Sequence, residues 1–249
     1  DRELAVIASS HNGESYHLEA VSSILKKVEL ETHHLQCGPH LPMQPEANKR
    51  VIASGEEPSS LHNNCSGKHA GMLLLAKYLD ADLETYLHPD HPVQQLIRKF
   101  ILEIGGVSNL NEVVTGIDGC GAPVYAFPLV HLAQTAANLN DHPAGEKVIQ
   151  AMGAYPDYVA GSDRVETSLM KVTHSRIIAK SGAEGLFWLL NREQKMGLAL
   201  KIEDGNLRAV PPAITALLSQ LGWLSEQELQ QLDEYYQPKL TNWSKTIVG

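Results

Sequence analysis

The sequence is poor in cysteine, in basic residues and in long apolar runs. Its 249 residues include only three cysteines, Cys37, Cys65 and Cys120. An odd number at such wide spacing matches no small disulfide framework and indicates a reducing cytoplasm. No stretch of about 18 uncharged apolar residues is present, and no leader with a charged start and an apolar centre opens the chain. We therefore expect a soluble cytoplasmic protein without a membrane partner.

Basic side chains are outnumbered by acidic ones. Lysine and arginine number 20 against 29 aspartate and glutamate residues, which gives a formal net charge of −9. Binding a nucleic-acid backbone requires clustered basic groups. We therefore expect no nucleic-acid partner and a small-molecule substrate.

The remaining composition is that of a folded protein. With 249 residues, 43% of them hydrophobic, the chain is long enough for one large domain or two small ones. It begins at Asp1 rather than at a methionine, directly before an apolar segment at 4–8. We expect the chain to be the larger part of a longer polypeptide, incomplete at its N-terminus.

Apolar spacing predicts a helix-rich protein. Apolar residues recur every three or four positions through 15–30, which predicts an amphipathic helix. Ser66 is expected to cap a second helix that runs into the apolar stretch 72–79. Further helices are expected over 92–104, 128–138, 145–155, around Thr167, 211–221 and 225–235.

Strand-length apolar runs are fewer. We expect a short buried strand at 113–117, which leads into a glycine-rich turn at 118–123. The runs 176–179, 186–190 and 196–202 predict an antiparallel meander. The fold class is therefore α+β, with a helix-rich region around an antiparallel sheet. We expect a single domain over 1–249, helix-rich over about 15–172, with the sheet and C-terminal helices over about 173–249.

Three polar clusters carry reactive side chains: 9–14, 65–68 with 118–120, and 179–185. The first follows an apolar element and precedes a helix, so its side chains can be held rigidly beside a cleft. The alternative interpretation is a turn between two helices, in which Ser and Asn cap the helix ends.

The second cluster suits a metal or a thiol nucleophile. Cys65 and Lys68 share a face on a helical turn, and with Cys120 they suit zinc in an open site with water as the fourth ligand. Lysine is an unusual ligand because it must first lose its proton. Cys65 as a nucleophile with His69 as base, and a buried inert thiol, are the alternatives.

The third cluster matches part of a known catalytic set. Lys180-Ser181-Gly182 at a strand end is similar to the Lys-Thr-Gly element of penicillin-recognising serine hydrolases, and Ser10-His11-Asn12 is similar to their Ser-x-Asn element. Their nucleophilic Ser-x-x-Lys should come first. One such string, Ser23 to Lys26, lies later, in the middle of the amphipathic helix, and we assign it to helix surface.

Longer strings point to one family. The strings 10–14, 62–72, 116–123 and 179–185, with shorter pieces at 91–94 and at 160–164 with Thr167, resemble the rhizobial-type (thermolabile) L-asparaginase II family across essentially the whole chain. The resemblance implies a serine β-lactamase-like fold and an amidohydrolase that converts asparagine to aspartate and ammonia. Family members carry a Ser-x-x-Lys in an N-terminal segment, to which nothing here corresponds. If the serine of that segment is the primary nucleophile, this chain alone lacks it, and Ser10 with Lys180 either forms the serine–lysine pair itself or supports the missing one.

The resemblance also implies roles for individual residues. Ser10 and Lys180 would be catalytic, and Cys65, Lys68 and Cys120 would hold zinc. Arg164 is our candidate for binding the substrate carboxylate, because its planar guanidinium suits bidentate contact. The full set of expected substrate-binding residues is His11, Asn12, Glu14, Asp118, Arg164 and Gly182.

Three functions follow as hypotheses. The first is a serine amidohydrolase, in which a lysine of lowered pKa takes the serine proton. The second is a cysteine amidase built on Cys65 and His69. The third is a truncated relative that binds an amino acid without hydrolysing it. A homodimer is the expected assembly.

Overall fold

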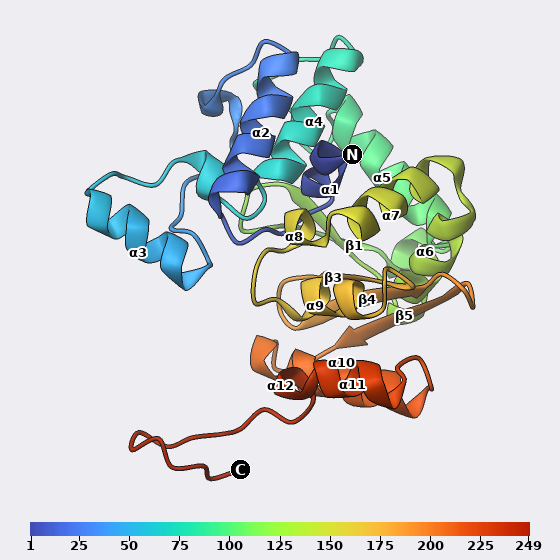
Figure 1. Cartoon of the computed structure of the whole chain (residues 1–249). Helices are drawn as coiled ribbons and strands as arrows, with labels where there is room; N and C mark the ends of the chain where they lie inside the picture. Colours follow the sequence, from blue (N-terminus) through green and yellow to red (C-terminus); the bar gives the residue numbers. More distant parts are fainter.

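The computed structural model describes all 249 residues (Figure 1). The α-helices are α1 (Arg2–Ile7), α2 (Ser15–Lys27), α3 (Pro45–Ser54), α4 (Ser66–Tyr78), α5 (Pro92–Ile104), α6 (Leu129–Asp141), α7 (Pro143–Ala154), α8 (Pro156–Val159), α9 (Val165–Val172), α10 (Val210–Gln220), α11 (Glu226–Gln231) and α12 (Asp233–Tyr236). The strands are β1 (Val114–Ile117), β2 (Pro123–Ala126), β3 (Ile177–Ser181), β4 (Leu186–Asn191) and β5 (Met196–Lys201). This mixture of helices and small antiparallel sheets agrees with the expected α+β class.

The larger sheet is the predicted meander. Its order is β3-β4-β5, and both pairs are antiparallel. α6 packs on β4 and β5, while α7 and α9 contact β3. Helix α6 lies so close to β5 that a Cβ at Gly197 would come within 1.9 Å of the Ala133 carbonyl oxygen. Lys180 and Ser181 end β3, so the sheet fixes where the third polar cluster lies.

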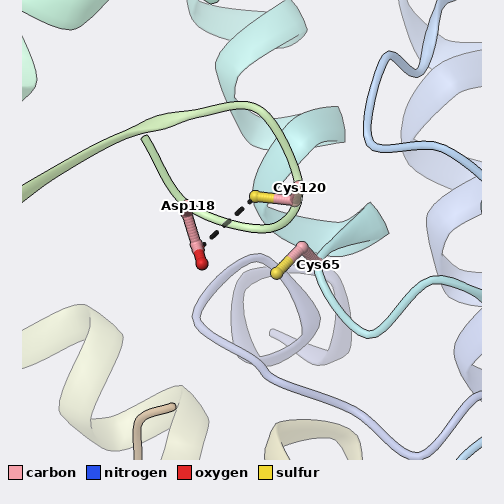
Figure 2. A group of neighbouring side chains, drawn as sticks. All are labelled: Cys65, Asp118 and Cys120. Atoms are coloured by element: carbon pink, nitrogen blue, oxygen red, sulfur yellow. Dashed lines mark hydrogen bonds between the residues drawn. The ribbon is translucent and has the colours of Figure 1, made fainter. Parts of the chain in front are cut away.

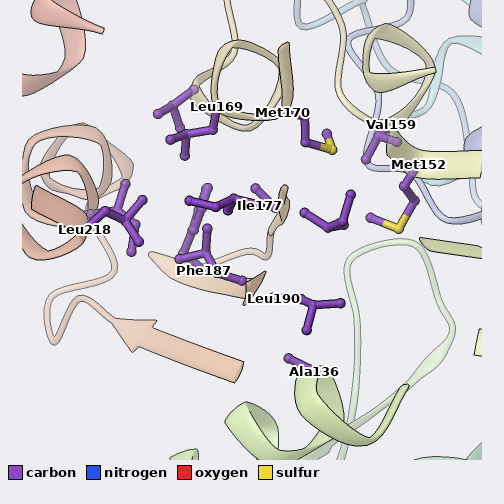
Figure 3. Close-up of a cluster of buried hydrophobic side chains, with 14 of the residues drawn as sticks. Ala136, Met152, Val159, Leu169, Met170, Ile177, Phe187, Leu190 and Leu218 are labelled. Carbon is purple, nitrogen blue, oxygen red and sulfur yellow. The ribbon is translucent and has the colours of Figure 1, made fainter. Parts of the chain in front are cut away.

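Two apolar clusters hold these elements together. The larger one joins the meander to α7, α9 and α10, and buries side chains such as Leu169, Ile177 and Phe187 completely (Figure 3). The second lies among α1, α2 and α4 and includes Val21 and Leu73. Burial of this apolar surface is the main stabilising contribution to such a fold.

A close helix crossing joins the first two polar clusters. A Cβ at Gly67 would lie 2.0 Å from the carbonyl oxygen of Val6, so α1 contacts the start of α4 directly at a residue without a side chain. The segment after α1 then runs along the N-terminus of α4, where the His11 N–H donates to the Asn64 carbonyl at 3.1 Å. Residues far apart in sequence therefore meet at this crossing.

Most of the predicted helices and strands are present, and the structure differs from the prediction in four respects. Ser66 is not a cap: Cys65 occupies the N-cap position, and the Ser66 hydroxyl donates to the Leu61 carbonyl instead. The expected buried strand forms as β1, but every residue in it is exposed, because no element other than β2 packs extensively against it. The helix expected over 225–235 is interrupted at Leu232 and forms α11 and α12. Helices α3 and α8 and strand β2 were not predicted, and the apolar segment at 4–8, which was expected only as an ordered element, belongs to helix α1.

Helix α3 stands apart from the rest of the chain in Figure 1 and contains no buried residue. None of the helices combines the length and the apolar composition that crossing a bilayer requires. On α2, Lys26 is exposed, as expected for helix surface, whereas Ser23 is half-buried and its hydroxyl donates to Glu3 of α1 at 2.8 Å.

Candidate active site

The loop between α1 and α2 is held on both sides by backbone hydrogen bonds. Ser10 N–H donates to the Val159 carbonyl at 3.0 Å, and Asn12 N–H donates to the Ala160 carbonyl at 2.8 Å. The Ser10 hydroxyl oxygen accepts a hydrogen bond from the Asn64 side-chain amide at 3.2 Å. This bond uses an oxygen lone pair and leaves the hydroxyl proton of Ser10 available for transfer.

Lys180 provides an amine of lowered pKa. Its Nζ donates to the Ser181 carbonyl at 2.6 Å. Burial lowers the pKa of Lys180 to about 8, although the charge of Glu166 acts in the opposite direction. No hydrogen bond joins Lys180 to Ser10 in this structure. The charge of Lys180 nevertheless acts on His11, after burial and the neighbouring histidines, so Lys180 lies near the loop that carries Ser10.

His11 is fully enclosed by protein. Its Nδ1 accepts from the Gly13 N–H at 3.1 Å, so Nε2 carries the hydrogen and contacts the Ser66 hydroxyl at 2.9 Å. Burial, first, and nearby positive charges hold the pKa of His11 well below its usual value. His11 is therefore neutral, stacks on His17 at 4.7 Å and connects the loop to α4.

Asn12 and Glu14 bind the segment before α9. The Asn12 side chain donates to the Ser162 carbonyl at 2.8 Å, and the Glu14 carboxylate accepts from the Ser162 N–H at 2.9 Å and from its hydroxyl at 2.7 Å. Burial alone would raise the pKa of Glu14, but the bonds from Ser162 and Tyr16 outweigh it and lower that pKa. Gly161 has φ +118°, and a Cβ there would lie 2.4 Å from Glu14.

Arg164 joins the loop to the end of β3. Nη1 donates to Asn12 Oδ1 at 2.9 Å, and Nη2 donates both to Glu166 at 2.8 Å and to the Ser181 hydroxyl at 2.9 Å. Gly182 follows Ser181 in the chain, and its N–H donates to the Leu186 carbonyl at 2.7 Å. The first and third polar clusters thus form one hydrogen-bonded unit.

The second cluster gathers two thiols and a carboxylate. The ligand atoms of Cys65, Asp118 and Cys120 all lie within 4.8 Å of one another, and Figure 2 shows the three side chains converging. Cys65 stands at the start of α4, while the other two belong to the β1–β2 turn. Lys68 Nζ donates to Asp118 at 3.3 Å, and Cys120 Sγ lies 3.5 Å from the same oxygen.

The pKa values of the groups in this cluster are shifted in different directions. The contact between the two cysteines lowers the pKa of Cys120 and, together with burial, raises the pKa of Cys65. Burial alone would lower the pKa of Lys68, but Cys65, Cys120 and Asp118 outweigh it and raise that pKa. Thiolate and carboxylate donors this close suit zinc, which also takes nitrogen ligands. The residues present therefore fit the expected ion.

His69 does not act on Cys65 by any hydrogen bond. It is wholly buried, its Nδ1 lies 2.7 Å from the Tyr86 hydroxyl, and its Nε2 has no partner that meets the geometry of a hydrogen bond. Besides the contact with Cys65, interaction with His69 lowers the pKa of Cys120. His69 therefore interacts with Cys120 and is not placed to act as a base for Cys65.

Sequence reasoning missed Glu166, Ser162 and Tyr86. Glu166 lies four residues before Met170 on the buried face of α9, and a carboxylate on an apolar helix face was the available signal. Ser162 and Tyr86 gave no comparable signal, because their partners are distant in sequence.

Comparison with known proteins identifies the family. A search of curated proteins finds no match for this chain. A scan against models of protein families matches L-asparaginase II over residues 1–249. Because that match covers the whole chain, the chain belongs to the L-asparaginase II family.

Proposed function

We propose that this chain hydrolyses L-asparagine to L-aspartate and ammonia through a serine nucleophile assisted by lysine. Family membership indicates an amidohydrolase acting on asparagine. The observation that carries the serine–lysine mechanism is the lowered pKa of Lys180, at the end of β3 near the loop that presents Ser10. A serine hydroxyl is a weak nucleophile at neutral pH and needs such a base.

In the proposed reaction, Ser10 Oγ attacks the carbon of the substrate side-chain amide, and neutral Lys180 accepts the hydroxyl proton. The carbon–nitrogen bond then breaks, and the leaving group takes a proton and departs as ammonia. Water next attacks the β-aspartyl ester, which releases aspartate and restores the serine. The Asn64 amide orients Oγ by its hydrogen bond. Movement of the Lys180 side chain toward Ser10 on substrate binding is part of this proposal.

Substrate recognition would fall to the residues around these two groups. Arg164 has donors beyond those it uses on Asn12, Glu166 and Ser181, and these suit the substrate carboxylate. Asp118 suits the substrate ammonium. Gly182 follows Ser181 at the end of β3, where a Cβ would press against the Leu186 side chain, and its role in substrate binding is part of the proposal. His11, Asn12 and Glu14 would contribute to binding through the loop that they hold in place.

We propose zinc as the cofactor, held by Cys65, Lys68 and Cys120 with Asp118 alongside. The support is the convergence of two sulfurs and a carboxylate within 4.8 Å. When bound, zinc supplies a Lewis acid that orients or polarises the substrate. Lys68 would lose its proton on ligation, and Cys120 already favours the thiolate form.

Three further expectations remain proposals. The β3-β4-β5 meander with α6, α7 and α9 packed against it supports a serine β-lactamase-like fold. Exposed apolar side chains on neighbouring strands, Val114, Ile117 and Val124, support a homodimer. Three free cysteines support a cytoplasmic location.

The cysteine alternative finds less support. A nucleophilic thiol needs a lowered pKa, whereas the pKa of Cys65 is raised by its contact with Cys120 and by burial. His69, the expected base, is bonded to Tyr86 instead.

Ammonia release from asparagine by the full-length protein tests the proposal. Ser10→Ala and Lys180→Ala should each lower kcat by at least about a hundredfold, the usual contribution of such groups. Ser23→Ala is the matched control, because Ser23 belongs to a Ser-x-x-Lys string on α2 and lies outside the candidate site. Ammonia release by Ser10→Ala at the parent rate contradicts the proposal, and calorimetric binding of asparagine without turnover by the parent indicates a binding protein.

A further inference from the structure

Glu166 is a buried carboxylate that the proposed reaction does not use. Its side chain is 2% exposed, on the first turn of α9. Burying a charge is unfavourable unless partners compensate it. Here Oε1 accepts from Arg164 at 2.8 Å and from the Ser181 hydroxyl, while Oε2 accepts no hydrogen bond.

Ser181 connects Glu166 to Lys180. The Ser181 hydroxyl donates to Glu166, and the Ser181 carbonyl accepts from Lys180 Nζ at 2.6 Å. Arg164 donates to the same hydroxyl, so the Ser181 side chain is held by both members of the ion pair. Any shift of Glu166 therefore moves the residue that fixes the lysine amine.

We propose that Glu166 is a positioning residue for Lys180, which holds the amine through Ser181 and stabilises its ammonium form through the carboxylate charge. The inference rests on the proposed function only for the role of Lys180 as the base. Glu166 itself would touch neither substrate nor the reacting atoms. Its effect would be to keep the amine in place and to limit how readily Lys180 gives up its proton.

The charged groups around Lys180 support this role. Burial lowers the pKa of Lys180 to about 8, and Glu166 is the largest influence in the opposite direction. From α9, Arg164 lowers that pKa further. From the start of α4, Cys65 raises it and Lys68 lowers it. His11 is buried nearby and neutral. Removing the carboxylate charge should therefore lower the pKa of Lys180 further and leave the charge of Arg164 uncompensated.

The direct test measures this pKa in full-length protein without turnover. Amines are labelled competitively with acetic anhydride across a pH series, and mass spectrometry reports the label on Lys180. Glu166→Gln should lower the midpoint of Lys180 labelling by about one pH unit, the effect of losing a nearby opposite charge. Glu193→Gln on the exposed β4–β5 turn is the control, and Lys171 is the internal reference. An unchanged midpoint in a folded Glu166→Gln protein overturns the proposal.

Two variants separate the positioning of Lys180 from the effect of the Glu166 charge. They also test the positioning role if the Glu166→Gln protein does not fold. Glu166→Asp keeps the charge but shortens the side chain, and Ser181→Ala removes the bridging hydroxyl. Both should keep the midpoint near that of the parent while lowering kcat for ammonia release at least about tenfold. Parent-like kcat in both variants overturns the positioning role. Absence of ammonia release by the parent contradicts the proposed function instead and leaves the labelling result to decide the charge effect.

Discussion

The hydroxyl of Tyr86 lies 2.7 Å from Nδ1 of His69, and both side chains are wholly buried. The same hydroxyl oxygen accepts from the Gln36 N–H at 2.9 Å. Its hydrogen can therefore bind Nδ1, an arrangement in which the ring hydrogen lies on Nε2. That Nε2 lacks any other partner, and His69 lowers the pKa of Cys120 after the larger effect of Cys65. The Tyr86–His69 pair thus acts on the cluster of Cys65, Asp118 and Cys120 through Cys120.

Tyr86→Phe removes the hydroxyl that selects this tautomer. We expect the free energy of unfolding to fall by about 1–2 kcal/mol, because Nδ1 and the Gln36 N–H both lose their partner. Zinc affinity should fall about tenfold, as for loss of other groups that orient metal ligands. Urea unfolding and a competition titration with a zinc chelator measure the two effects. Tyr78→Phe, at an 85% exposed residue, should change neither; parent-like affinity in Tyr86→Phe contradicts this account.

The metal assignment predicts one zinc ion per chain. Elemental analysis of full-length protein should find stoichiometric zinc, and Cys120→Ser and Cys65→Ser should both lose it. Cys37→Ala is the matched control, because Cys37 donates to the Ser60 carbonyl and lies outside the ligand cluster. Affinity should fall as the pH falls, since protons compete for the thiolates. Equal zinc content in all three variants would rule out the assigned ligands.

His17 should make stability depend on pH. Burial lowers the pKa of His17 from 6.5 to about 4. Between these values the unfolded chain binds a proton that the folded chain excludes, so stability is greatest above pH 6.5 and falls as the pH falls toward 4. The loss attributable to His17 is at most roughly 3 kcal/mol. Urea unfolding at several pH values should show a shallower slope for His17→Gln, and the parent slope for the exposed His33→Gln.

The crossing at Gly67 predicts a steric effect on the site. Gly67→Ala would place a methyl group 2.0 Å from the Val6 carbonyl oxygen, so α1 and α4 must separate. We expect a loss of about 1–3 kcal/mol in stability, as for other overpacked positions, together with weaker zinc binding because Cys65 and Lys68 start the same helix. Thermal unfolding checks the first effect. Gly119→Ala, where the added carbon meets nothing within 4 Å, should leave the melting temperature unchanged.

The fold was predictable where the pattern along the chain is local. The runs that form β4 and β5 have strand length and a turn between them, so the meander followed from sequence. The exposure of β1 did not, because a short apolar run is the same whether or not another element covers it. Helix α3 lacked a buried face to reveal it.

The site shows the same division. The strings around Ser10, Cys65 and Lys180 marked the reactive side chains, but the contacts among them join residues about 50 to 150 positions apart. Spacing within a motif carries no information on such contacts. Glu166 illustrates this limit, since its place beside Ser181 depends on how α9 packs on β3.

Trapping the covalent intermediate tests the central claim most directly. Full-length protein mixed with asparagine is quenched in acid during turnover and digested, and mass spectrometry locates the β-aspartyl group. The serine–lysine account predicts an ester on the peptide that contains Ser10, absent in Ser10→Ala. An ester confined to another serine, or a thioester on Cys65, contradicts it.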